Sequence, residues 1–77
     1  MTSRFAGISG QEIIKILEKH FGFIFISQKG SHLKFRKIEN EKTITVIIPN
    51  HSELAEGTLR NILRQAQIDF NDFLQYK

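Results

Sequence analysis

The chain has 77 residues and a formal net charge of +3, a length that predicts one domain and a charge that favours an anionic partner only weakly. It contains no cysteine, which excludes disulfides and thiolate metal ligands. No apolar run approaches the roughly 20 residues of a membrane span, and the N-terminus lacks the apolar stretch of a signal peptide. We therefore expect a soluble protein of the cytoplasm without a membrane partner.

The first predicted element is a helix over residues 9–21. Ser9 and Glu12 have the spacing of a capping box, in which each side chain accepts a hydrogen bond from the backbone of the other. Apolar residues then recur at helical spacing, and Gly22 ends the helix. Residues 1–7 carry no such pattern and are expected to be loose.

Three strands are predicted next. Residues 23–27 are rich in β-forming side chains, and residues 28–30 predict a tight turn. Residues 31–38 alternate between polar and apolar, which is typical of a half-buried strand. A second turn at residues 39–42 leads into a third strand over residues 43–48. Two short turns in succession predict an antiparallel meander.

A polar loop leads into a helix over residues 57–66, and Asp69 is placed to cap a last short helix. The order α-β-β-β-α predicts a single α+β domain over residues 1–77, a two-layer sandwich whose three-stranded antiparallel sheet has both main helices on one face. The other face of the sheet is then left open. Five phenylalanines are assigned to the core rather than to stacking on bases: Phe23, Phe25, Phe35, Phe70 and Phe73.

The middle strand carries the most suggestive chemistry. If Leu33 and Phe35 point toward the helices, alternation puts His32, Lys34 and Arg36 together on the open face. The two cations repel each other unless an anion lies between them, and a phosphodiester would satisfy them. An imidazole beside such a site is suited to moving protons, which makes His32 a candidate acid or base. Taken alone, the pattern favours the simpler interpretation, a solvated histidine on a polar strand.

RNA supplies its own nucleophile, the 2′-hydroxyl, so a nuclease that uses it needs no metal. The turn amides around Gly30 can add phosphate contacts. His51, after the third strand, is a candidate second acid or base, although an exposed loop histidine is the simpler interpretation. His20, near the end of the first helix, is interpreted as structural. The three histidines lack the spacing of a zinc site, and no cofactor is expected.

Two further features concern partners. Arg60 and Arg64 either extend the basic surface toward RNA or simply solvate their helix. The first and third strands are apolar on both faces, and helices can cover only one of them. The exposed remainder indicates a protein partner or self-association, so a homo-oligomer is among the expected assemblies.

The residues also carry a family resemblance. In order, SGQEIIKILEKHFGF, FISQKGSHLKF and TVIIPNHSELAEGTLRNILRQAQI resemble the HicA (YcfA-like) toxins of bacterial toxin–antitoxin systems. The resemblance covers about residues 8–75. Its central mark is the Gly30-Ser31-His32 step, and its second is Gly57-Thr58-Leu59-Arg60 followed by Ile62-Leu63.

This resemblance implies a fold like that of a double-stranded-RNA-binding domain and an activity of translation-independent mRNA cleavage that arrests growth. The family's catalytic histidine falls on His32, and the implied partner is a HicB-type antitoxin that blocks the active face. Residues and resemblance together predict an RNA-binding set: Lys29, Gly30, Ser31, Lys34, Arg36, Arg60 and Arg64. The alternatives are a non-catalytic RNA-binding module of the same fold and a pure protein-interaction domain.

Overall fold

The structure, a computed structural model, describes residues 7–77. Its elements run in the order α1 (Gly10–His20), β1 (Ile24–Lys29), β2 (His32–Glu39), β3 (Lys42–Pro49), α2 (Glu56–Ala66) and α3 (Phe70–Leu74). The predicted α+β class and the α-β-β-β-α order are therefore confirmed. The expectation of a loose segment at residues 1–7 falls almost entirely outside the described residues.

Helix α1 begins with the predicted capping box. The Ser9 hydroxyl accepts a hydrogen bond from the Glu12 amide at 3.1 Å, and the Glu12 carboxylate accepts one from the Ser9 amide at 3.0 Å. These bonds satisfy two of the donors that a helix start leaves unpaired. One face of the helix, which includes Ile13 and Leu17, is then buried against the sheet.

The sheet is an antiparallel meander in the order β1-β2-β3. Gly30 has φ +60°, as the first position of a two-residue hairpin turn requires, and the turn is formed by Gly30 and Ser31. This turn lies later than the predicted 28–30, so Lys29 belongs to β1 and pairs with His32. The second turn, at residues 40–41, has positive φ at both positions, the pattern of a type I′ turn.

An irregularity in β1 changes which of its side chains share a face. Phe25 lies opposite Phe35, but the next pair joins Ser27 to Lys34, so Ile26 is an extra residue and forms a β-bulge. Directly paired residues point to the same side of a sheet. The bulge therefore reverses the alternation, and from Ser27 onward the odd-numbered residues of β1 face away from the helices.

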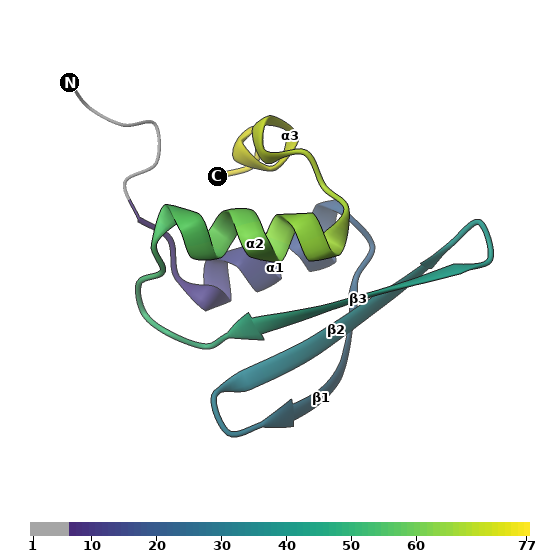
Figure 1. The fold of residues 1–77 in the computed structure, drawn as a ribbon, viewed down its shortest axis with the longest axis horizontal. Coiled ribbons are helices and arrows are strands. Elements are labelled where there is room, and N and C mark those ends of the chain that lie inside the picture. The colour runs from purple at the N-terminus through teal and green to yellow at the C-terminus, as the bar shows by residue number, and fades with distance from the viewer. Residues whose placement is uncertain (1–6) are drawn as a thin grey trace.

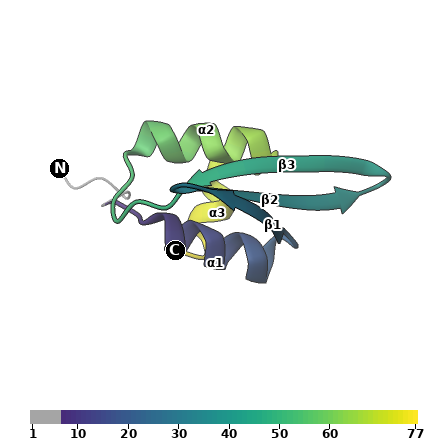
Figure 2. The ribbon, with the colours of Figure 1, turned by 90° about the horizontal axis from the view of Figure 1, so that it is seen from below.

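Both main helices lie on one face of the sheet, as predicted (Figure 1). The short helix α3 lies on the outer side of this helix layer, and Figure 2, seen from below, shows α1 and α2 apart from each other within that layer, both running alongside the strands. The far end of the β2–β3 hairpin extends past both helices. None of the helices within residues 7–77 is long and apolar enough to cross a membrane.

Three of the five phenylalanines assigned to the core, Phe23, Phe35 and Phe73, are fully buried, and Phe70 is half-buried against the core. The assignment of Phe25 was wrong, because 50% of this residue is exposed. β1 is an edge strand that the helices do not cover, and all six of its residues are exposed. Phe25 contacts only the edge of the core, where its ring meets Phe35 edge to face at 5.7 Å.

Candidate functional site

The open face of the sheet carries the predicted polar row of β2. His32 is exposed, and Lys34 and Arg36 are half-buried, whereas Leu33 and Phe35 between them are buried toward the helices. The alternation of β2 thus places the imidazole and the two cations on the face that no helix covers.

Residues of all three strands form a hollow around His32. The hollow has a volume of about 480 Å³ and is lined by Ser27, Lys29, His32, Lys34 and Ile47. Lys29 pairs with His32, and Ser27 and Ile47 both pair with Lys34, one on each side. The lining residues thus come from two neighbouring rows across the sheet. The bulge in β1 is what brings Ser27 and Lys29 to this face.

The cations of the open face are free to bind an anion. Within residues 7–77, none of Lys29, Lys34 and Arg36 forms an ion pair. The Arg36 guanidinium contacts only the Thr45 hydroxyl, at 3.5 Å. Unpaired cations this close together raise the local positive potential, which favours a ligand that carries several negative charges.

The turn beside the hollow is held in place by hydrogen bonds to both of its carbonyls. Gly30 needs its glycine for the positive φ and not for space, since a Cβ there would meet nothing within 4 Å. The Gln28 side-chain amide donates to the Gly30 carbonyl at 2.9 Å, and the Asn50 amide donates to the Ser31 carbonyl at 2.7 Å. Gly30 and Ser31 are exposed at the end of the sheet where His32 lies.

The start of α1 packs against the segment that follows β3. The Gly10 amide donates to the His51 carbonyl at 2.9 Å, and a Cβ on Gly10 would clash with the Pro49 carbonyl oxygen. Pro49 is the β3 partner of His32. His51 is exposed and follows Pro49 by two residues, but it does not line the hollow around His32.

Arg60 and Arg64 lie in α2, in the layer on the other side of the sheet, so the structure does not bring them together with His32. The Arg60 guanidinium pairs with Glu56 at 2.9 Å and lies over the Phe70 ring at 3.8 Å from its centre. Arg64 donates to the Asn61 side chain at 2.7 Å. Their predicted contact with RNA stays a prediction.

One carboxyl at the far end of β2 is electrostatically perturbed. The Lys37 ammonium lies 2.8 Å from the Glu39 carboxylate, and its hydrogen bond and charge hold the pKa of Glu39 below its usual value. Lys37 also lies over the Phe23 ring, 5.3 Å from its centre, and so points to the helix side. This pair is therefore separate from the hollow around His32.

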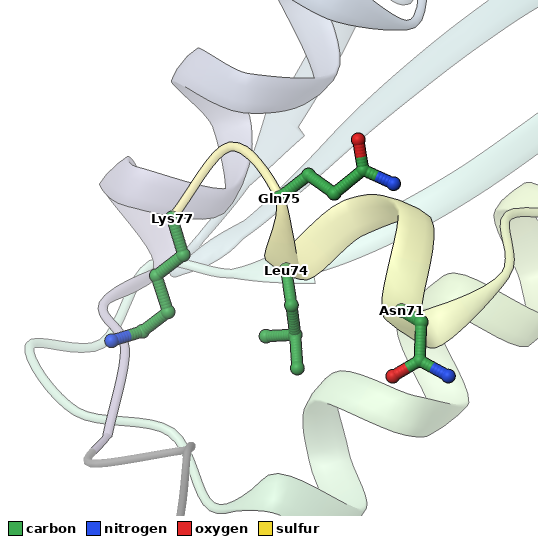
Figure 3. Close-up of a pocket in the computed structure, with 4 residues that line it drawn as sticks. All are labelled: Asn71, Leu74, Gln75 and Lys77. Atoms are coloured by element: carbon green, nitrogen blue, oxygen red, sulfur yellow. The ribbon is translucent and has the colours of Figure 1, made fainter.

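A second hollow, of about 490 Å³, lies on the helix side beside α3 (Figure 3). It is lined by Asn71, Leu74, Gln75 and Lys77, and Figure 3 shows Asn71 and Leu74 pointing toward α2 and Gln75 pointing away. None of these four residues is a histidine, an aspartate or a glutamate, so their side chains offer no group suited to acid–base chemistry near neutral pH. In the described part of the chain, no group of three or more His, Cys, Asp or Glu is placed to hold a metal ion.

A protein-family model described as "HicA toxin of bacterial toxin-antitoxin" matches residues 10–68, which include every strand and both main helices. The chain belongs to the HicA toxin family. It is therefore a toxin of a bacterial toxin–antitoxin system, and membership in the family implies a cognate antitoxin. No curated protein is similar enough to the chain to count as a match. The resemblance noted in the sequence is thus confirmed at the level of the family.

Two residues of the hollow were not singled out from the sequence as functional. Ser27 was expected to end a strand, and only the bulge turns it toward His32. Ile47 did carry a signal, because it is apolar between Val46 and Ile48, two positions that alternation already assigns to the core. An apolar residue out of phase in a half-buried strand lies on the open face, where a ligand can reach it.

Proposed function

We propose that this HicA-family toxin is an endoribonuclease that cleaves mRNA on the open face of its sheet without a metal ion. The observation that carries the proposal is the hollow in which His32 stands beside two unpaired lysines, Lys29 and Lys34. A histidine next to cations on an uncovered surface suits a reaction that moves protons on a polyanion. The proposal locates the activity in the cytoplasm, where mRNA is found.

In the proposed reaction, the ribose 2′-oxygen forms a bond to phosphorus and the bond from phosphorus to the 5′-oxygen breaks. The products are a 2′,3′-cyclic phosphate and a 5′-hydroxyl. One group removes the proton of the 2′-hydroxyl and another delivers a proton to the departing 5′-oxygen. His32 performs one of these transfers, and His51 or a water molecule performs the other.

Lys29, Lys34 and Arg36 have a different role in this scheme. Their fixed charges bind the phosphates and stabilise the extra negative charge that develops on phosphorus during attack. The exposed turn at Gly30 and Ser31 adds backbone contacts at the end of the sheet where His32 lies. These assignments predict that RNA binding weakens as the salt concentration rises.

The decisive experiment replaces His32 by alanine and measures mRNA cleavage and growth arrest. We expect His32→Ala to abolish both while circular dichroism shows an unchanged fold. His20→Ala is the matched control, since it removes an imidazole that stacks on Tyr76 at 3.9 Å and lies outside the hollow. Full cleavage by folded His32→Ala protein would refute the proposed role. Cleavage should also persist in excess EDTA, and its loss there would indicate a metal ion.

The alternative is an RNA-binding module that does not cut. It is favoured by the hollow itself, whose lining residues include one histidine and no carboxylate to serve as a second acid or base. Wild-type protein that binds RNA with a steep salt dependence and leaves it intact would support this alternative. A protein with no RNA affinity even at low salt would instead indicate a domain that contacts only proteins.

We also propose that a HicB-type antitoxin covers the open face. Beside the cationic end of this face lie apolar side chains that the helices do not reach, with 62% of Ile24 and 75% of Ile38 exposed. These two residues line a smaller hollow of about 170 Å³ with Gly22, Arg36 and Lys37. A partner that seats an apolar side chain there and extends along β2 toward His32 blocks access of RNA.

The antitoxin proposal is tested with Ile24→Ser and Ile38→Ser toxins and their cognate antitoxin. We expect both substitutions to weaken binding in calorimetry, because each removes apolar area from the contact. Thr43→Ala is the control, because it truncates a neighbouring polar side chain on the same face. Full antitoxin affinity in both isoleucine variants would show that the antitoxin binds elsewhere.

A further inference from the structure

One side chain in the hollow around His32 has no use in binding phosphate. Ile47 is half-buried on the open face, between Val46 and Ile48, which are both buried toward the helices. From β3 it lies directly opposite Lys34 of β2, and the other residues that line the hollow, Ser27, Lys29 and His32, are polar. A phosphate gains nothing from an aliphatic surface, so Ile47 is suited to an apolar part of a ligand.

The flat face of a nucleobase is the apolar part of an RNA strand, and its edge carries hydrogen-bonding groups. The hollow offers partners for both. Ile47 supplies an aliphatic surface, and Ser27, on the far side of Lys34, supplies a hydroxyl that can donate or accept. The volume of the hollow, about 480 Å³, is within the range of small-ligand sites.

The two rows of side chains across the sheet suit two different parts of an RNA ligand, the phosphate and the base. Lys29, His32 and Pro49 form one row, with the proton carrier and a cation for the phosphate. Ser27, Lys34 and Ile47 form the next row, in which only the central residue is charged. Rows two residues apart along a strand are separated by about 6.6 Å, so a base held at the second row stays within one nucleotide of a phosphate at the first.

We propose that Ser27 and Ile47 form a nucleobase subsite beside the phosphate bound at His32. Ile47 packs against the face of the base, and the Ser27 hydroxyl bonds to its edge. The subsite deepens the proposed nuclease function and rests on RNA being the ligand of this face. It makes Ser27 and Ile47 the residues that set which base is preferred next to the cleaved bond.

The test measures base preference in binding, so that it does not depend on cleavage. Short single-stranded oligonucleotides of A, C, G or U are titrated into His32→Ala protein, and fluorescence anisotropy gives the four affinities. We expect one base to be preferred, and Ile47→Ala to weaken binding of that oligonucleotide by about tenfold, because it removes most of the apolar area that covers the base. Ser27→Ala should reduce the ratio between the best and worst bases.

Two further variants control for folding and position. Ile47→Thr keeps the β-branched shape that suits a strand and should reproduce the loss if Ile47→Ala proves unstable. Thr43→Ala truncates another open-face residue of β3, opposite Ile38 and outside the hollow, and should change neither affinity nor preference.

Unchanged ratios in folded Ile47 and Ser27 variants would overturn the proposal, as would an equal loss for all four oligonucleotides. The same titrations separate this proposal from the nuclease function. Wild-type protein that prefers one base through Ile47 but never cuts RNA would refute the nuclease function and support the subsite. Protein that cuts RNA while its Ile47 variants keep the base preference would support the nuclease function and refute the subsite.

Discussion

Gly10 leaves no room for a methyl group, and its replacement by alanine tests how the helix layer is attached to the sheet near His32. An alanine Cβ would clash with the Pro49 carbonyl oxygen and lie 3.1 Å from the Asn50 Cα. Both obstacles are backbone atoms, so no side-chain rotation relieves the contact. The Gly10 amide, which donates to the His51 carbonyl at 2.9 Å, would be displaced with it.

The expected cost follows from these contacts. Overpacking of a closely packed site costs about 1–3 kcal/mol, and alanine recovers part of it through its better helix propensity. We expect Gly10→Ala to lower the free energy of unfolding by about 1–2 kcal/mol. For a domain of this size, each kcal/mol corresponds to about 4–8 °C in Tm.

Gly57 provides the matched control, because the same substitution there should have the opposite sign. Gly57 lies in the first turn of α2, and a Cβ would meet nothing within 4 Å. Gly57→Ala should raise stability by about 0.5–1 kcal/mol through the lower entropy of its unfolded chain. Urea and thermal denaturation followed by circular dichroism measure both variants. Equal stabilities of the Gly10→Ala and Gly57→Ala proteins would refute the packing argument.

Three further predictions concern single interactions. Ser9→Ala removes the cap of α1 and should cost about 1 kcal/mol in urea denaturation, whereas Ser9→Asp should keep most of the stability; an equal loss in both would contradict the capping role. Phe70→Leu removes the ring beneath the Arg60 guanidinium and should cost about 0.5–1 kcal/mol beyond its loss of apolar area. The same cost in an Arg60→Met background would show that the cation contributes nothing. Lys37→Met should raise the pKa of Glu39 in an NMR titration, because the ammonium lowers it in the wild type. In the wild type, the pair of Lys37 and Glu39 stabilises the fold above the ordinary glutamate pKa, and this effect is lost as pH falls through the lowered pKa of Glu39. An equal Glu39 pKa in the wild type and in Lys37→Met would contradict the role of the ammonium.

The features predicted correctly from the sequence are those that short-range chemistry determines. The capping box of Ser9 and Glu12 needs only four consecutive residues. A turn at Gly30 needs only a glycine that tolerates positive φ, although the turn lies later than the predicted residues 28–30. The shared face of His32 and Lys34 follows from strand alternation within β2 alone.

The features that were missed depend on contacts between elements. The bulge at Ile26 is defined by the pairing of β1 with β2, and no residue type within β1 indicates it. The sequence therefore did not predict that Ser27 lies in the hollow. Phe25 was assigned to the core because its own strand suggests it. Its exposure results from the position of β1 at the edge of the sheet, which the helices leave uncovered. The pattern of a strand indicates which side chains prefer burial, but it does not indicate whether another element of the fold covers them.

The bulge in β1 also bears on how readily two copies of the toxin can pair edge to edge. The outer edge of β1 is unpaired, and Ile24 and Phe25 are exposed there, a combination that invites another strand and promotes aggregation. A bulge interrupts the even spacing of backbone groups along such an edge and adds local twist. A second copy therefore cannot add a regular ladder along the whole strand, and Lys29 at its end repels an approaching basic copy. The extra residue that turns Lys29 toward the open face thus also works against a regular edge-to-edge contact between two copies.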